Sequence, residues 1–222
     1  MKLKNECAYD ATGNIVLASE AVKGQDYFCP SCREKFVFKN SGKTGRGSKC
    51  AHFSHASESN CNESALHAIF KHKTVSILRE YIARNEPFDV VRLCRKCGKI
   101  KISNALYGIS RVEEEFSLGV GCPRPDIVLF DVHDKPVMVI EIVVSHEPED
   151  ATLKFYQEKN IVMLKYYPQL QDLHNVEDCL QVPFIDFICT SCRLRNTYPI
   201  QIRPIRSKYI IERGKLKRKR RF

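Results

Sequence analysis

Hydrophobic and polar positions follow different periods along the chain, and each change of period marks a predicted element. Between Leu66 and Ile82 an apolar residue recurs every three or four positions, which predicts a long helix over residues 62–84. Later apolar segments are short and rich in β-branched residues, which predicts strands. The elements predicted after the first helix are strands over residues 111–118, 126–131 and 137–145, a helix over 148–159 and a strand over 161–168. This order predicts an α/β fold in which helices cover a mixed sheet.

Two of the predicted strands, on either side of a polar turn at residues 133–136, each carry one carboxylate. Asp126 and Glu141 stand where a buried strand would favour an apolar side chain. Burying an unpaired carboxylate is costly, so two of them on neighbouring strands indicate a shared cation. Carboxylate oxygens suit a hard ion such as Mg²⁺ or Mn²⁺. The hairpin over residues 124–145 is therefore the predicted site of a hard metal ion.

Near the N-terminus, two short motifs have the residue types of a zinc site. The CPSC motif places two cysteines on a tight turn, and the later HFSH motif supplies two histidines. Together they would give zinc a tetrahedral shell of two sulfurs and two nitrogens. The alternative is that both histidines are polar surface residues. The predicted ligands are Cys29, Cys32, His52 and His55, with Cys50 and Cys61 as rival ligands.

Two further CxxC motifs, one on each side of the predicted sheet, indicate a four-cysteine zinc ribbon. Both motifs follow apolar, β-branched residues, as the strands of a ribbon would. Because four protein ligands leave no open coordination position, both predicted zinc ions are expected to be structural. The predicted ribbon ligands are Cys94, Cys97, Cys189 and Cys192, and the leftover cysteines, Cys7, Cys122 and Cys179, are expected to be ordinary small residues.

Positive charge is concentrated at the C-terminal end of the chain. The whole sequence has a formal net charge of +10, and residues 203–222 hold ten Lys and Arg against one acid, Glu212. Such a tail is solvated and poorly ordered, or a cationic arm that binds phosphates non-specifically, and the two are compatible. No apolar run reaches the roughly 18 to 20 residues that a membrane span needs, and no secretory signal is recognised. We therefore expect a cytoplasmic protein with reduced thiols and no membrane partner.

The motifs CPSC, HFSH, ESALHAIFK, RPDI and EIVVS follow one another in an order that resembles the competence protein CoiA family over residues 6–167. More broadly, the RPD motif and the glutamate fifteen residues after its aspartate resemble the PD-(D/E)XK, or restriction-endonuclease-like, nucleases. The resemblance implies a restriction-endonuclease-like core, an α-β-β-β-α-β mixed sheet, with an N-terminal zinc-finger module and an embedded four-cysteine zinc ribbon. It also implies active-site roles for Glu63, His67, Asp126 and Glu141.

One position departs from the family pattern, and one has a second interpretation. The superfamily pattern on the third strand ends in Lys, and CoiA-like proteins tend to have Gln there, whereas this sequence has Val143. Related nucleases sometimes supply the lysine from the next helix, so Lys154 is the predicted replacement. Glu63, His67 and Lys71 are spaced four apart and share one stripe of the first predicted helix. Glu63 could instead serve only to cap that helix.

The predicted function is metal-dependent hydrolysis of nucleic-acid phosphodiester bonds, with DNA as the expected partner and Mg²⁺ or Mn²⁺ as the catalytic ion. The alternative is a catalytically silent, zinc-containing DNA-binding module derived from a nuclease, which Val143 favours. Three acids near DNA would repel its phosphates, so their presence favours the enzyme. A zinc-stabilised adaptor that contacts proteins is a third interpretation. The predicted domains are a zinc-binding module over residues 1–58, a nuclease-like domain with the inserted ribbon over 59–202 and a basic tail over 203–222.

Overall fold

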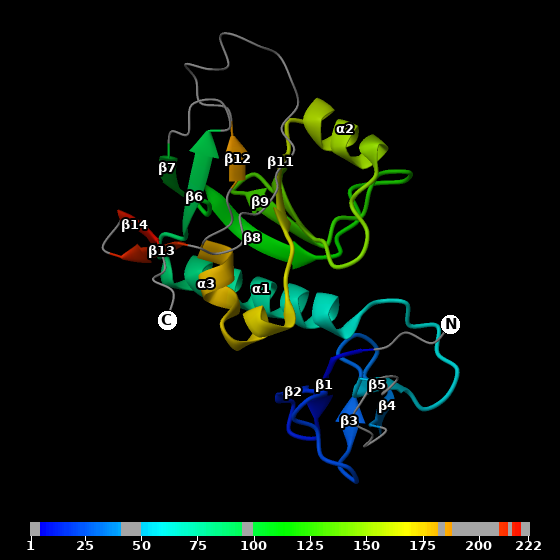
Figure 1. Cartoon of the computed structure of the whole chain (residues 1–222). Coiled ribbons are helices and arrows are strands. Elements are labelled where there is room, and N and C mark those ends of the chain that lie inside the picture. The colour runs from blue at the N-terminus through cyan, green and yellow to red at the C-terminus, as the bar shows by residue number, and fades with distance from the viewer. Residues whose placement is uncertain are drawn as a thin grey trace. The chain divides into compact units, whose positions relative to one another are not determined.

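The structure, a computed structural model, is described over residues 5–40, 50–94, 100–181, 185–187, 209–212 and 215–218 (Figure 1). Its contacts divide the chain into two compact units. Unit 1 comprises Met1–Phe70 and Pro168–Leu173, and unit 2 comprises Lys71–Tyr167 and His174–Phe222. The domain limits predicted from the sequence stay a prediction.

Unit 1 contains an antiparallel five-stranded sheet in the order β2-β1-β3-β4-β5. Aromatic rings fill its core: Tyr27 and Phe53 have centroids 4.9 Å apart, and Phe36 stacks on Phe53 at 6.1 Å. These rings supply the apolar area that such short strands need to stay folded. The strands are β1 (Cys7–Asp10), β2 (Ile15–Leu17), β3 (Tyr27–Phe28), β4 (Lys35–Lys39) and β5 (His52–His55).

The long helix α1 (Ala65–Arg84) begins three residues later than the apolar period predicts. Ser64 sets this start, because its hydroxyl accepts a hydrogen bond from the backbone N–H of His67 at 3.2 Å. At the other end Asn85 adopts a left-handed conformation with φ of 54°, which is a common way for a helix to stop. The boundary between the two units falls inside this helix, after Phe70.

Unit 2 contains a four-stranded mixed sheet in the order β11-β10-β9-β8. The pairs β8·β9 and β9·β10 are antiparallel, whereas β10·β11 is parallel and needs a crossover, which α2 (Asp150–Glu158) supplies. The predicted strands are therefore observed, each shorter than predicted, and the fold is mixed α/β. The strands are β8 (Ile109–Glu114), β9 (Ile127–Asp131), β10 (Pro136–Ile142) and β11 (Val162–Tyr166).

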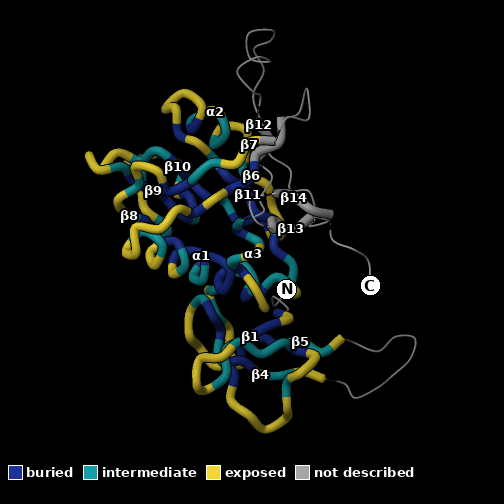
Figure 2. Tube along the Cα trace, turned by 90° about the vertical axis from the view of Figure 1, so that its left-hand side faces the viewer, coloured by how far each residue is buried: buried dark blue, intermediate teal, exposed yellow. Residues whose placement is uncertain are grey.

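Helices lie on both faces of this sheet. On one face Tyr156 of α2 packs with Val128 and Val139 in a buried cluster. On the other face the hydroxyl of Tyr166 donates to the carbonyl of Leu180 in α3 (Val176–Gln181) at 3.2 Å. A short 3₁₀ helix, η1 (Leu170–His174), precedes α3. Residues 127–130 of the central strand β9 are all buried (Figure 2), so the sheet is the core of unit 2.

A second sheet of unit 2 has the order β12-β6-β7. Its outer strand β12 (Ile185–Phe187) runs parallel to β6 (Asp89–Cys94), while β7 (Ile100–Asn104) is antiparallel to β6. Part of the predicted basic tail is a strand pair rather than an unstructured arm: β13 (Tyr209–Glu212) pairs with β14 (Lys215–Arg218). None of the helices in the described part of the chain is long and apolar enough to span a bilayer.

Candidate functional site

Three cysteines and one histidine of unit 1 converge on one point. One ligand atom from each lies within 4.8 Å of all the others. The Sγ atoms of Cys29 and Cys61 are 3.8 Å apart, and Cys32 Sγ lies 3.2 Å from His55 Nε2. Tetrahedral zinc with Zn–S bonds of about 2.3 Å requires sulfurs about 3.8 Å apart, so the spacing and the donor types fit. These four residues could hold a metal ion such as zinc.

Backbone hydrogen bonds shape the turn that carries the first two sulfurs. The N–H of Cys29 donates to the carbonyl of Glu34 at 2.8 Å, and the N–H of Arg33 donates back to Cys29 at 3.0 Å. Arg33 takes a left-handed conformation with φ of 63°, which lets the chain reverse within these few residues. His55 ends β5 with its ring edge-on to Phe36 at 4.8 Å. Burial raises the pKa of the Cys29 thiol to about 12, so a cation beside it is needed to hold it as a thiolate at neutral pH.

The observed ligand set differs from the predicted one at His52, whose place Cys61 takes. Both histidines of the HFSH motif lie on β5, and residues three apart on a strand point to opposite faces. His55 is therefore turned into the cluster and buried, whereas His52 Nδ1 lies 2.9 Å from the carbonyl oxygen of Cys50. Of the two rival cysteines, Cys50 is exposed and outside the cluster. Because the whole HFSH segment is a strand, only one of its two histidines can face the cluster.

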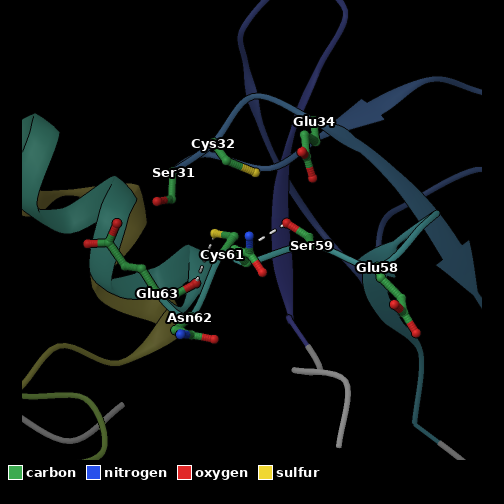
Figure 3. Close-up of a pocket in the computed structure, with 9 residues that line it drawn as sticks. Ser31, Cys32, Glu34, Glu58, Ser59, Cys61, Asn62 and Glu63 are labelled. Carbon is green, nitrogen blue, oxygen red and sulfur yellow. Dashed lines mark hydrogen bonds between the residues drawn. The ribbon is translucent and has the colours of Figure 1, made fainter.

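A cavity of about 580 Å³ opens beside this cluster (Figure 3). Cys32 and Cys61 lie on its wall, so the metal site reaches the protein surface there. Three glutamates give the rest of the wall an acidic character. The lining residues are Ser31, Cys32, Glu34, Glu58, Ser59, Asn60, Cys61, Asn62 and Glu63.

For the second predicted zinc site, only the backbone of one ligand position is described. Cys94 ends β6, and the remaining ligand positions, Cys97, Cys189 and Cys192, lie outside the described residues. The strand β12, which leads toward Cys189, pairs in parallel with β6, and Phe187 is opposite Cys94. Parallel strands run toward the same edge of a sheet, so the strands leading to the two CxxC motifs end side by side. The four-cysteine ribbon stays a prediction.

The two predicted carboxylates of unit 2 are neighbours across the hairpin. Ile127 pairs with Ile140 in the antiparallel register, which places Asp126, one residue earlier, beside Glu141, one residue later. The backbone N–H of Ile142 donates to Asp126 Oδ2 at 2.7 Å and fixes that carboxylate against β10. Both carboxylates are half-buried. The sequence prediction that these two acids lie together on adjacent strands is therefore confirmed.

Tyr156 is a member of this site that the sequence analysis missed. Its hydroxyl donates to Glu141 Oε1 at 2.9 Å. Burial raises the pKa of Tyr156 well above its usual value, and the nearby negative charges of Glu141 and Asp126 raise it further. The phenol therefore keeps its proton and acts as a donor to Glu141 at all physiological pH values. An isolated tyrosine in a predicted helix gave no signal of this role.

Lys154, the predicted replacement for the missing lysine, lies elsewhere on α2. Its side chain is 76% exposed and its ammonium group is 3.8 Å from Glu158, four residues along the helix. Positions two residues apart on a helix differ by about 200°. Because Tyr156 faces Glu141, Lys154 points to a different side of the helix. The prediction that Lys154 faces the acids is therefore not supported by its position.

Of the stripe predicted on the first helix, His67 and Lys71 lie on α1, whereas Glu63 precedes it. In unit 1, Glu63 Oε1 lies 2.6 Å from His67 Nδ1, so these two side chains form a hydrogen-bonded pair. In unit 2, the buried Lys71 forms ion pairs with Glu114 and Glu115. The active-site roles of Glu63 and His67 rest on the family resemblance and stay predictions.

We expect Tyr156→Phe to lower the free energy of unfolding by about 1–2 kcal/mol near pH 8, because Glu141 loses its donor. Unfolded tyrosine ionises near pH 10, whereas folded Tyr156 keeps its proton. The contribution is thus fully present below about pH 10 and is lost as the pH rises above it. Urea unfolding should show that the free energy of unfolding falls more in the wild type than in the variant when the pH is raised from near 8 to above about 10. The control is Tyr107→Phe, whose side chain is 88% exposed; an alkaline loss of equal size in Tyr156→Phe and the wild type would contradict the assignment.

The described residues thus contain two centres of different chemistry, one in each unit. The cluster of three cysteines and one histidine suits a soft or borderline ion such as zinc, and the Asp126–Glu141 pair accepts hydrogen bonds from the Ile142 N–H and the Tyr156 hydroxyl. Neither centre includes His52 or Lys154. In the comparisons with known proteins, no family model, no curated protein and no solved structure matches the chain.

Proposed function

We propose that the chain is a metal-dependent nuclease that hydrolyses phosphodiester bonds in nucleic acid, with DNA as its expected substrate. The observation that carries the proposal is the pairing of two half-buried carboxylates, Asp126 and Glu141, on adjacent strands of a sheet that helices cover on both faces. Each carboxylate has one oxygen held by a donor of the protein. Such fixed oxygen ligands suit Mg²⁺ or Mn²⁺, which phosphodiester hydrolysis commonly uses.

The protein groups around the two acids would orient them toward a shared ion. The N–H of Ile142 fixes Asp126, and the hydroxyl of Tyr156 fixes Glu141, which are contacts of the kind that position metal ligands. A bound Mg²⁺ or Mn²⁺ would lower the pKa of an attacking water and offset charge on the phosphate. A cation between the two carboxylates would also weaken their repulsion of an approaching phosphate.

The arrangement of elements in unit 2 supports the same proposal. Apart from β6 and β7, which stand between α1 and β8, the elements α1, β8, β9, β10, α2 and β11 follow one another in the order that the nuclease resemblance implies. Asp126 directly precedes the second strand of that order, β9, and Glu141 lies on the third, β10. We assign a structural role to zinc held by Cys29, Cys32, His55 and Cys61, because four protein ligands leave no position for a substrate. A second structural zinc at Cys94, Cys97, Cys189 and Cys192 belongs to the same proposal.

A silent DNA-binding module is the second candidate, and Val143 favours it. This residue is buried, and its backbone N–H donates to the carbonyl of Tyr166 at 2.7 Å, which continues the parallel ladder past β10. The side chain of valine is uncharged, so it cannot offset the negative charge of a phosphate. A protein with this site would still bind metal and nucleic acid without cleaving it.

The test is incubation of the purified chain with supercoiled, linear and single-stranded DNA and with RNA, in Mg²⁺ or Mn²⁺ and in a chelator. We expect metal-dependent cleavage of at least one substrate and none in the chelator. Binding without cleavage in either metal would establish the silent module instead. Loss of all nucleic-acid affinity at low salt would favour an adaptor that contacts proteins. Metal analysis of the same sample should find two zinc ions per chain if both zinc sites are real.

A further inference from the structure

A lysine lies in register with the paired carboxylates. The parallel register of β10 and β11 places Lys165 directly opposite Glu141. Residues opposite each other on neighbouring strands have their side chains on the same face of the sheet. Glu141 is in turn next to Asp126, the residue directly before β9. Asp126, Glu141 and Lys165 therefore form a charged row across three strands.

The ammonium group of Lys165 is held inside the protein. The side chain is only 5% exposed, and Nζ lies 2.7 Å from Glu147 Oε2. Removing an ammonium group from water costs several kcal/mol unless opposite charge compensates it, so a buried lysine at this place needs a reason. Glu147 is itself 56% exposed and also accepts a hydrogen bond from Tyr167 at 2.7 Å. Water can therefore replace Lys165 as a donor to Glu147, provided that the ammonium group gains another negatively charged acceptor.

Lys165 lies near Val143, the position where the third strand lacks the lysine of the superfamily pattern. Val143 follows Glu141 by two residues, so its side chain is on the same face as the charged row. The backbone N–H of Val143 donates to the carbonyl of Tyr166, the residue after Lys165, so Val143 and Lys165 lie near the same end of β10. A lysine on β11 can thus bring positive charge to a region where β10 provides none. Lys154, on the exposed side of α2, cannot do so without moving.

We propose that Lys165 is the cationic residue of the acidic site and contacts a non-bridging oxygen of the substrate phosphate. The inference rests on the proposed nuclease function. Glu147 accepts the hydrogen bond of the Lys165 ammonium group in the free protein, and the phosphate oxygen accepts it when nucleic acid is bound. The charge of the ammonium group then offsets the negative charge that grows on the phosphate as water attacks.

Four single variants of the full chain test this role. Lys165→Met removes the charge, Lys165→Arg keeps it, Glu147→Gln changes only the partner, and Lys154→Met is the matched control. We expect Lys165→Met to lower the single-turnover cleavage rate by about 100- to 1,000-fold, as loss of a group that stabilises the transition state does. Lys165→Arg should recover part of this loss, and the other two variants should cleave like the wild type.

A binding measurement gives a readout that needs neither metal nor cleavage. In a chelator, Lys165→Met should reduce the slope of log affinity against log salt concentration for a DNA duplex by about one phosphate contact. Lys154→Met should leave that slope unchanged. An unchanged slope in Lys165→Met would overturn the contact with phosphate.

The cleavage outcomes separate this inference from the proposed function. Full cleavage by Lys165→Met, with cleavage lost in Asp126→Asn, overturns the role of Lys165 and leaves the nuclease standing. No cleavage by the wild type in any metal overturns both. Equal losses in Lys165→Met and Glu147→Gln would show that the ion pair is only structural. If Lys165→Met fails to fold, wild-type cleavage by Glu147→Gln together with cleavage by Lys165→Arg supports the proposal, and loss in Glu147→Gln overturns it.

Discussion

Replacing Cys61 by serine is expected to release one zinc ion and unfold unit 1. A structural zinc site of this kind contributes about 10–16 kcal/mol of apparent binding free energy to folding at neutral pH. The strands of unit 1 are short, with three residues in β2 and two in β3, and we expect their small aromatic core not to offset a loss of this size. Zinc content, together with limited proteolysis mapped to residues 5–70, measures the effect. We expect proteolysis of this segment to become rapid in Cys61→Ser and in wild type treated with a strong chelator.

His52→Ala is the matched control for the zinc site. His52 lies three residues from the ligand His55 on the same strand but faces away from the cluster. We expect this variant to keep its zinc and its resistance to proteolysis, whereas His55→Ala should lose both. Retention of zinc in Cys61→Ser together with its loss in His52→Ala would show that the HFSH motif supplies both nitrogen ligands and that Cys61 is not a ligand.

Asp126→Asn and Glu141→Gln are expected to abolish cleavage. Either change removes a charged oxygen ligand from the proposed metal site, and we expect the rate to fall by at least about 1,000-fold, the upper range for loss of a direct electrostatic contact. Neither change should unfold the protein. The Asn oxygen still accepts the N–H of Ile142, and removing one of two adjacent negative charges relieves their repulsion. Single-turnover cleavage and the melting temperature without metal are the two measurements.

Asp134→Asn is the control for these two variants. Asp134 lies in the turn of the same hairpin, is 74% exposed and pairs with Arg111 at 2.7 Å. Cleavage by this variant should equal that of the wild type. If Asp126→Asn instead cleaves as well as Asp134→Asn, the activity does not come from this site. A lower metal-free melting temperature in Asp126→Asn would mean that the carboxylate mainly serves the fold.

The two carboxylates were predictable because their signal is local. Asp126 and Glu141 interrupt apolar runs on either side of one short turn, and a hairpin brings such positions together whatever the rest of the chain does. The choice between His52 and Cys61 was harder. It depends on whether the HFSH segment is a strand or a turn, and on the path of the chain between β5 and α1.

The lysine could not be assigned from sequence order alone. Lys154 follows the third strand closely, but a helix has one side facing the sheet, and that side carries Tyr156. Lys165 becomes a neighbour of Glu141 only through the parallel register of β10 and β11, which no local pattern in the sequence determines. Lys165 lies on the edge strand β11, and the structure nevertheless buries it. Long-range pairing, rather than residue type, decides which lysine meets the acids.

The parallel pairing of β6 with β12 also has a mechanical consequence. The start of one parallel strand and the end of the other lie at opposite ends of the pair, so tension applied before Asp89 and after Phe187 pulls the strands past each other. All the hydrogen bonds between them then bear the load together and must break at once. The four-stranded sheet of β8, β9, β10 and β11 lies between β6 and β12 in the sequence. A pulling force along the polypeptide would therefore act on the hydrogen bonds between β6 and β12 before it reached Asp126 and Glu141.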